Sequence, residues 1–172
     1  MHPLINALGF QSAWWACIAG VGHGLELPAL AYCSLLACLH LAFTKTRRQE
    51  VLLAAISVLA GLAIDSMLQA LGFINFYGWS LVGLSPFWLW ALWVLFAMTL
   101  NSSLAFLQNT PWVMSAILGA LFGPLTYYAG AQLGAAAFDA SVINFLALAL
   151  TWMCAMPAHV LIAKKLYSHE RF

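Results

Sequence analysis

Six apolar runs follow one another along the chain and leave little sequence between them. They lie at about residues 4–21, 27–44, 51–72, 86–107, 111–134 and 141–163. Because a helix needs roughly 20 apolar residues to cross the hydrocarbon core of a bilayer, each run is long enough for about one crossing. Only 6% of the residues are charged, against roughly 25% in an ordinary soluble domain. The pattern predicts an all-α integral membrane fold, in which residues 1–172 form a single domain of six transmembrane helices joined by short loops.

The positively charged residues predict the orientation of these helices. Three of them lie between the second and third runs and three follow the sixth run: Lys45, Arg47, Arg48, Lys164, Lys165 and Arg171. An even number of crossings precedes both groups, so all six fall on one side of the membrane. Since Lys and Arg accumulate in short cytoplasmic loops, we expect this side, and with it both termini, to be cytoplasmic.

Aromatic residues are the second unusual feature, with eight tryptophans in the chain. Most lie near the expected ends of helices, where Trp favours the headgroup region of the bilayer. Trp90 and Trp93 lie deeper in the fourth run, and we interpret them as candidates for lining a cavity. The segment 73–86 is too apolar for a solvated linker, and we expect it to lie in the interface or to fold back over the bundle.

Asp65 is the only acidic residue deep within an apolar run, and an ionisable side chain there is a functional hypothesis by default. At 100° per residue, Gln69 falls on the same helix face, together with small residues. That face should therefore contact protein. The alternative is that Asp65 forms a hydrogen bond with a neighbouring helix and only fixes packing.

His23 and Glu26 form a second candidate group, in the sequence GHGLELP. Their spacing lets both side chains project to one side of a helix, at a depth close to that of Asp65 and Gln69. The four residues could converge as a proton relay. A lone HxxE motif is too common to predict a metal site, and we expect neither a metal nor another cofactor. With a formal net charge of +1, nucleic acid is not an expected partner.

Small and polar residues in the fourth and fifth runs favour helix packing. Asn101, Ser102 and Ser103 are consecutive, and such side chains commonly form interhelical hydrogen bonds. Their alternative role is to line an inner cavity. In the fifth run, two GxxxG steps predict a face for close helix contact, formed by Gly119, Gly123, Gly130 and Gly134. Pro124 follows Gly123 at mid-membrane, and Tyr127 and Tyr128 come one turn later, so this kink is a candidate ligand-facing site.

Four segments together resemble a known family of small bacterial inner-membrane proteins, domain-of-unknown-function family 2878. They are NALGFQSAWW near the N-terminus, Asp65 followed by Gly72, PFWLWALWVLFAMTLNSSLAFL in the fourth run and GALFGPLTYYAG in the fifth. The resemblance covers most of the chain. It implies a multi-helix protein of the bacterial inner membrane and assigns no activity.

Three hypotheses for function follow from these features. In the first, the protein binds or transports a small apolar or lipid-like molecule, in a cavity lined by Asp65, Trp90, Trp93, Tyr127 and Tyr128. In the second, it is an intramembrane enzyme that modifies a lipid with His23, Glu26 and Asp65. In the third, it is a structural or assembly subunit whose glycine face binds a protein partner. The sequence alone does not decide between enzyme and binding protein.

Overall fold

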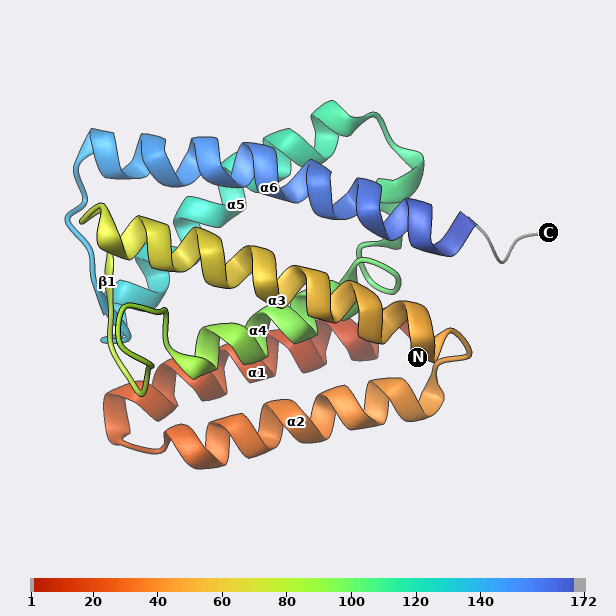
Figure 1. Cartoon of the computed structure of the whole chain (residues 1–172), viewed down its shortest axis with the longest axis horizontal. Coiled ribbons are helices and arrows are strands. Elements are labelled where there is room, and N and C mark those ends of the chain that lie inside the picture. Colours follow the sequence, from red (N-terminus) through yellow and green to blue (C-terminus); the bar gives the residue numbers. More distant parts are fainter. Residues whose placement is uncertain (1, 169–172) are drawn as a thin grey trace.

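Six α-helices carry the chain back and forth along the long axis of the molecule (Figure 1). The structure is a computed structural model that describes residues 2–168. In chain order the elements are α1 Pro3–His23, α2 Glu26–Phe43, α3 Arg47–Ala70, β1 Asn75–Phe76, α4 Phe87–Thr99, the 3₁₀-helix η1 Ala105–Asn109, α5 Trp112–Gln132, β2 Ala136–Ala137 and α6 Val142–Ser168. Helix α1 begins and α6 ends at the same end of the bundle.

Five of these helices, all except α4, are long and apolar enough to cross a membrane. Their outward faces carry large apolar side chains, which a soluble protein would bury. Leu59, Trp112 and Ile143, for example, are each about 70% exposed. The sequence-based prediction of an all-α membrane protein is therefore confirmed. Lys45 on the α2–α3 connection, Arg47 and Arg48 at the start of α3 and the two lysines near the end of α6 lie at the end where α1 begins. Arg171 lies outside the described residues.

Helix α4 is shorter than the expected span at 86–107, because it ends at Thr99 and gives way to a turn and η1. Its 13 residues are about 20 Å long, less than the roughly 30 Å hydrocarbon core. It lies between neighbouring helices, with Trp88, Leu92, Trp93 and Met98 all buried. The expected helix ends before Asn101, Ser102 and Ser103, where the side chains of Asn101 and Ser103 donate hydrogen bonds to Glu50 and Asn6 of other helices.

The end of the bundle opposite the termini is closed by a two-stranded antiparallel sheet. Strand β1, after α3, pairs with β2, after α5, with Asn75 opposite Ala137 and Phe76 opposite Ala136. The segment 73–86 thus folds back over the bundle, with Phe76 buried and Val82 fully exposed. Gly78 has a φ of 112°, and a Cβ there would lie 2.8 Å from Glu26 Oε2, so the turn requires glycine.

Helices α5 and α6 pack closely because α5 presents glycine to α6. A Cβ on Gly119 would overlap the backbone carbonyl of Trp152, and a Cβ on Gly123 would overlap the Trp152 ring. Further along, Gly130 faces Ile18 of α1. Gly134 follows the end of α5 in a turn with a φ of 89°, so it is not on the helix face. The glycines of α5 therefore pack against other helices of the same chain.

Candidate functional site

Asp65 is fully buried and joins three helices through its carboxyl group. Trp93 of α4 donates its indole N–H to Asp65 Oδ2 at 2.8 Å, and Tyr127 of α5 donates its hydroxyl to Oδ1 at 2.5 Å. Both carboxyl oxygens therefore accept a hydrogen bond, as a buried polar group in a membrane requires. We call Asp65, Trp93 and Tyr127 the Asp65 cluster. Its three members come from α3, α4 and α5, so the cluster fixes the middle of the bundle.

Aromatic rings surround this cluster. The Trp93 ring stacks on Trp152 of α6, with ring centroids 5.2 Å apart and planes 3° apart. It also stacks on the ring of His159 of α6, with centroids 5.4 Å apart. Phe96 meets Trp93 edge-on, with centroids 5.5 Å apart. Aromatic pairs in such geometries contribute about 0.5–1.5 kcal/mol beyond their buried area. The rings therefore hold Trp93 in the orientation that reaches Asp65.

Gly61 makes room for Trp93 against α3. A Cβ at this position would overlap the indole ring. Gly61 lies four residues before Asp65, so both fall on one face of α3, one turn apart. The polar and small stripe expected on α3 thus has a specific use, because glycine admits the ring and the carboxyl group binds its N–H.

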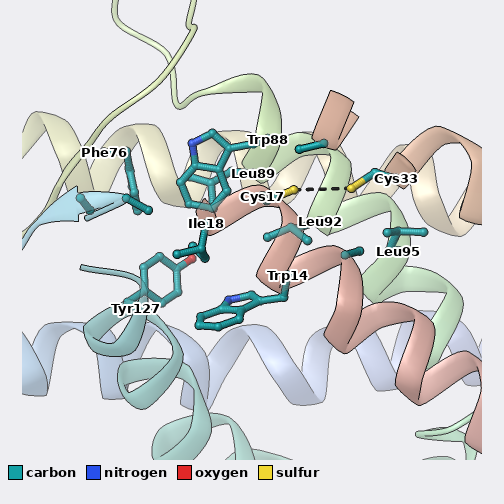
Figure 2. Packing of buried hydrophobic residues seen from close by; sticks show 14 of the residues in the cluster. Trp14, Cys17, Ile18, Cys33, Phe76, Trp88, Leu89, Leu92, Leu95 and Tyr127 are labelled. Carbon is teal, nitrogen blue, oxygen red and sulfur yellow. Dashed lines mark hydrogen bonds between the residues drawn. The ribbon is translucent and has the colours of Figure 1, made fainter. Parts of the chain in front are cut away.

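A cavity of about 80 Å³ lies beside the Asp65 cluster, between α1, α4, α5 and the sheet (Figure 2). Trp93 and Tyr127 form part of its wall, and the sheet closes one end with Phe76 and Ala136. The other lining side chains are mostly apolar and come from the three helices: Phe10, Trp14, Ile18, Trp88, Leu89, Leu92, Phe96, Thr126 and, from α6, Trp152. Most of these residues are buried, so the cavity belongs to the interior of the bundle.

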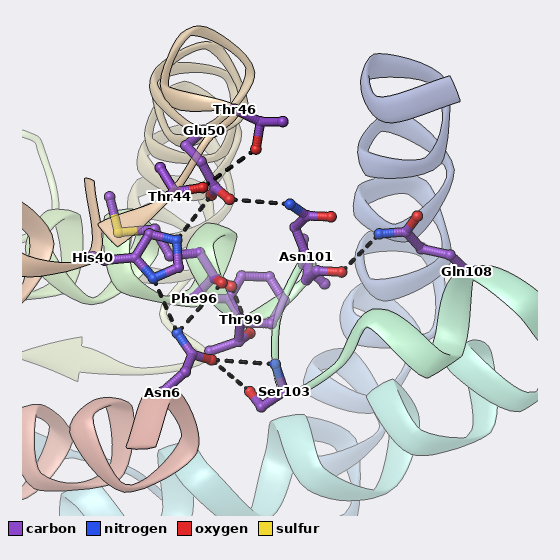
Figure 3. Close-up of polar contacts among 12 residues, drawn as sticks. Asn6, His40, Thr44, Thr46, Glu50, Phe96, Thr99, Asn101, Ser103 and Gln108 are labelled. Atoms are coloured by element: carbon purple, nitrogen blue, oxygen red, sulfur yellow. Dashed lines mark hydrogen bonds and ion pairs between the residues drawn. The ribbon is translucent and has the colours of Figure 1, made fainter. Parts of the chain in front are cut away.

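A second polar cluster lies at the end where the chain begins (Figure 3). His40 Nε2 is 3.3 Å from Glu50 Oε2, and Asn101 donates to Glu50 Oε1 at 3.1 Å. Ser103 donates its hydroxyl to Asn6 Oδ1 at 2.7 Å, and Asn6 Nδ2 lies 3.5 Å from His40 Nδ1. We call these five residues the Glu50 cluster. It joins α1, α2 and α3 to the turn after α4, and its side chains provide hydrogen-bond partners around that turn.

Asn6 and His40 also line a groove of about 510 Å³ between α1 and α2. Its walls include Ile5, Leu8 and Leu39, which are 42–61% exposed. The groove is therefore a furrow on the outer surface of the helices, where membrane lipid would lie. The cavity beside Asp65 differs because most of its lining residues are buried.

The structure brings together only part of the site expected from sequence. Asp65, Trp93 and Tyr127 meet, but Glu26 accepts a hydrogen bond from the backbone N–H of Trp79 at 2.8 Å, and His23 is exposed. Gln69 accepts from the backbone N–H of Phe76 at 3.4 Å. The side chains of Glu26 and Gln69 thus hold the segment 73–86 over the end of the bundle. Within residues 2–168 no three His, Cys, Asp or Glu side chains are grouped to hold a metal ion.

Two aromatic candidates lie away from the cavity. Trp90 donates its N–H to Ser85 Oγ at 3.2 Å and packs edge-on against Phe87. The Tyr128 ring contacts Phe138 and Phe145. Tyr128 points away from the cavity because adjacent positions on a helix differ by 100° and Tyr127 takes the inward direction. Trp90 is nearly one turn before Trp93 and contacts residues at and just before the start of α4 instead.

Sequence reasoning missed Trp14 and Trp152 in the cavity wall, and His40 and Glu50 in the second cluster. Trp14 is near the middle of the first run and Trp152 near the middle of the sixth, a depth that distinguishes both from the tryptophans at helix ends. Glu50 gives no such signal, since it belongs to the polar break TKTRRQE. In the structure it is buried beside His40 of α2 and Asn101 after α4.

Comparison with known proteins finds a family and no described relative. The model of the family described as protein of unknown function (DUF2878) matches residues 3–158. This match confirms the resemblance predicted from the four sequence segments. No curated protein and no solved structure matches the chain.

Proposed function

Because the chain belongs to the family of proteins of unknown function DUF2878, whose description assigns no activity, we propose a function from the site: the protein binds a small apolar or lipid-like molecule within the membrane. The observation that carries this proposal is the cavity of about 80 Å³ walled by buried aromatic side chains. Ligand sites are typically concave and largely apolar, with a few polar groups that fix orientation. If the molecule enters from one side of the membrane and is released on the opposite side, the same site serves transport.

The buried carboxyl group supports a binding role over simple packing. An acidic side chain in a membrane helix is costly, and apolar residues would pack three helices without it. Here its two hydrogen bonds go to Trp93 and Tyr127, which are themselves cavity walls. Asp65 therefore sets the shape of the cavity by fixing the position of two lining rings.

We extend the proposal to topology and location. All six helices cross the membrane, with α4 and the turn after it making the fourth crossing together. The end with the basic residues faces the cytoplasm, as the positive-inside bias indicates. The membrane is the bacterial inner membrane, a location that rests on the resemblance to the family.

The other two hypotheses have weaker support. A lipid-modifying enzyme built on His23, Glu26 and Asp65 would need these side chains near one another, and each has different surroundings. An assembly subunit would need a free glycine face, but Gly119 and Gly123 already pack on α6. A protein partner would therefore have to use a different face of the bundle.

Organic extraction of the purified protein tests the proposal. We expect mass spectrometry of the extract to find about one apolar molecule per chain that survives extensive detergent washing. Leu89→Phe, which adds a ring to the cavity wall, should lower this content severalfold. Leu121→Phe is the matched control, because Leu121 is exposed on α5 and does not line the cavity. Equal content in wild type and Leu89→Phe would overturn the proposal.

A further inference from the structure

Next to the cavity, a groove lies on the outside of the bundle between α1 and α5. The groove is lined by four residues of α1, three of α5 and the residue that follows α5: Phe10, Gln11, Trp14, Trp15, Leu125, Thr126, Ala129 and Leu133. Three of these residues, Phe10, Trp14 and Thr126, also line the cavity. The inner cavity and the outer groove therefore adjoin each other at these three residues.

Few contacts join α1 and α5, and those made at glycines lie near the sheet. A Cβ on Gly130 would lie 3.2 Å from Ile18 Cδ1, and one on Gly22 would lie 3.8 Å from the Leu133 carbonyl oxygen. Elsewhere the two helices scarcely contact each other, whereas α1 packs on α2 and α4, and α5 packs on α6. The groove between α1 and α5 therefore faces the outside of the bundle, where a membrane would place lipid chains.

The dimensions of the cavity select the shape of its occupant. A cavity of about 150 Å³ holds one benzene molecule, so about 80 Å³ is too small for a ring of that size. A linear hydrocarbon chain is narrower and can place only its end inside. The lining offers no charged side chain to the occupant, since the Asp65 oxygens are already bonded to Tyr127 and Trp93.

From these observations we infer that the ligand is a membrane lipid, and that one of its acyl chains passes between α1 and α5 and ends in the cavity beside Tyr127. This inference rests on the proposed binding function and narrows it to linear chains that enter sideways from the bilayer. The polar headgroup stays outside the bundle in the membrane interface, and the acyl chain passes the exposed Trp15 where it enters the groove. Entry from the bilayer requires no aqueous path, since the chain remains in an apolar environment throughout.

Photolabelling of the full-length protein in phosphatidylcholine vesicles tests the inference. The vesicles contain a small fraction of phosphatidylcholine with a diazirine at the end of one acyl chain, and labelled residues are mapped by mass spectrometry. We expect labels on cavity residues such as Leu89 and Leu92. In Ala129→Trp, where an indole fills the groove, this labelling should fall about tenfold, the effect of losing 1.4 kcal/mol of binding free energy.

Ala63→Trp is the matched control, because Ala63 is exposed on α3 and borders neither the cavity nor the groove. Its cavity labelling should equal that of the wild type, and circular dichroism of both variants checks their folding. Unchanged cavity labelling in Ala129→Trp would overturn the path between α1 and α5. Extraction of a compact ring molecule, with no acyl-chain label in the cavity, would overturn this inference and leave the binding proposal standing. An empty extract together with an unlabelled cavity would overturn both.

Discussion

The Asp65 cluster and the Glu50 cluster each contain one buried carboxyl group, but their surroundings differ. Asp65 accepts from two aromatic side chains, and both of these line the cavity. Glu50 contacts His40 and Asn101, and the cluster holds the end of α4 against α1, α2 and α3. The first cluster therefore shapes the cavity, whereas the second holds the turn that follows α4. We expect loss of the first to change the bound molecule and loss of the second to change stability.

The largest effect is expected for Glu50→Ala. Removing the carboxyl group leaves the buried His40 and the half-buried amide of Asn101 without their partner, which costs about 3–5 kcal/mol for a broken buried pair. Chemical denaturation in detergent would measure the free energy of unfolding. The folded fraction should still carry its apolar molecule. A loss of bound molecule without loss of stability would reverse the roles assigned to the two clusters.

Gly61→Ala should have the next largest effect, about 3 kcal/mol, because the added Cβ forces the Trp93 ring away from Asp65. Both stability and the content of extracted molecule should fall. Gly9→Ala is the control, since a Cβ there would lie 3.9 Å from Leu36 Cδ2, an ordinary contact. The free energy of unfolding of Gly9→Ala should rise by up to about 1 kcal/mol, because alanine has the higher helix propensity. Equal behaviour of the two variants would contradict the close fit at Gly61.

Tyr127→Phe should cost about 2 kcal/mol, because it leaves Asp65 Oδ1 without a donor. The cavity wall loses its anchor, so the extracted molecule should decrease more than stability does. Tyr128→Phe makes the same change at the next residue and keeps the ring contacts with Phe138 and Phe145. A parallel denaturation and extraction series would compare them, and identical results would remove the special role of Tyr127.

Ser103→Ala should have the smallest effect, about 1 kcal/mol, the net value of a single hydrogen bond. Asn6 Oδ1 loses the hydroxyl but keeps the backbone N–H of Ser103 at 3.3 Å. The amount of extracted molecule per chain should be unchanged. Extraction of Ser103→Ala and Tyr127→Phe side by side would check this. A change in the extract would link the Glu50 cluster to the cavity and weaken the contrast between the two.

Particular residues show how far sequence reasoning reached into the site. Asp65 was found because a lone acid in an apolar run is conspicuous, and Trp93 and Tyr127 because deep aromatic residues are unusual. Gln69 and Glu26 were expected near Asp65 but bind backbone N–H groups of the segment after α3. Their direction depends on how that segment folds back, and sequence spacing carries no information about it.

Hydropathy alone determined the all-α membrane fold and the approximate positions of five long helices, because each crossing must be apolar and must satisfy its own backbone hydrogen bonds. Only the tertiary structure decided where α4 ends, which glycines face Trp93 and Trp152, and that α1 and α5 diverge around a cavity. These features arise from contacts between residues far apart in the chain. Lipid and protein interior are equally apolar, so hydropathy does not distinguish a helix face that contacts lipid from one that contacts another helix.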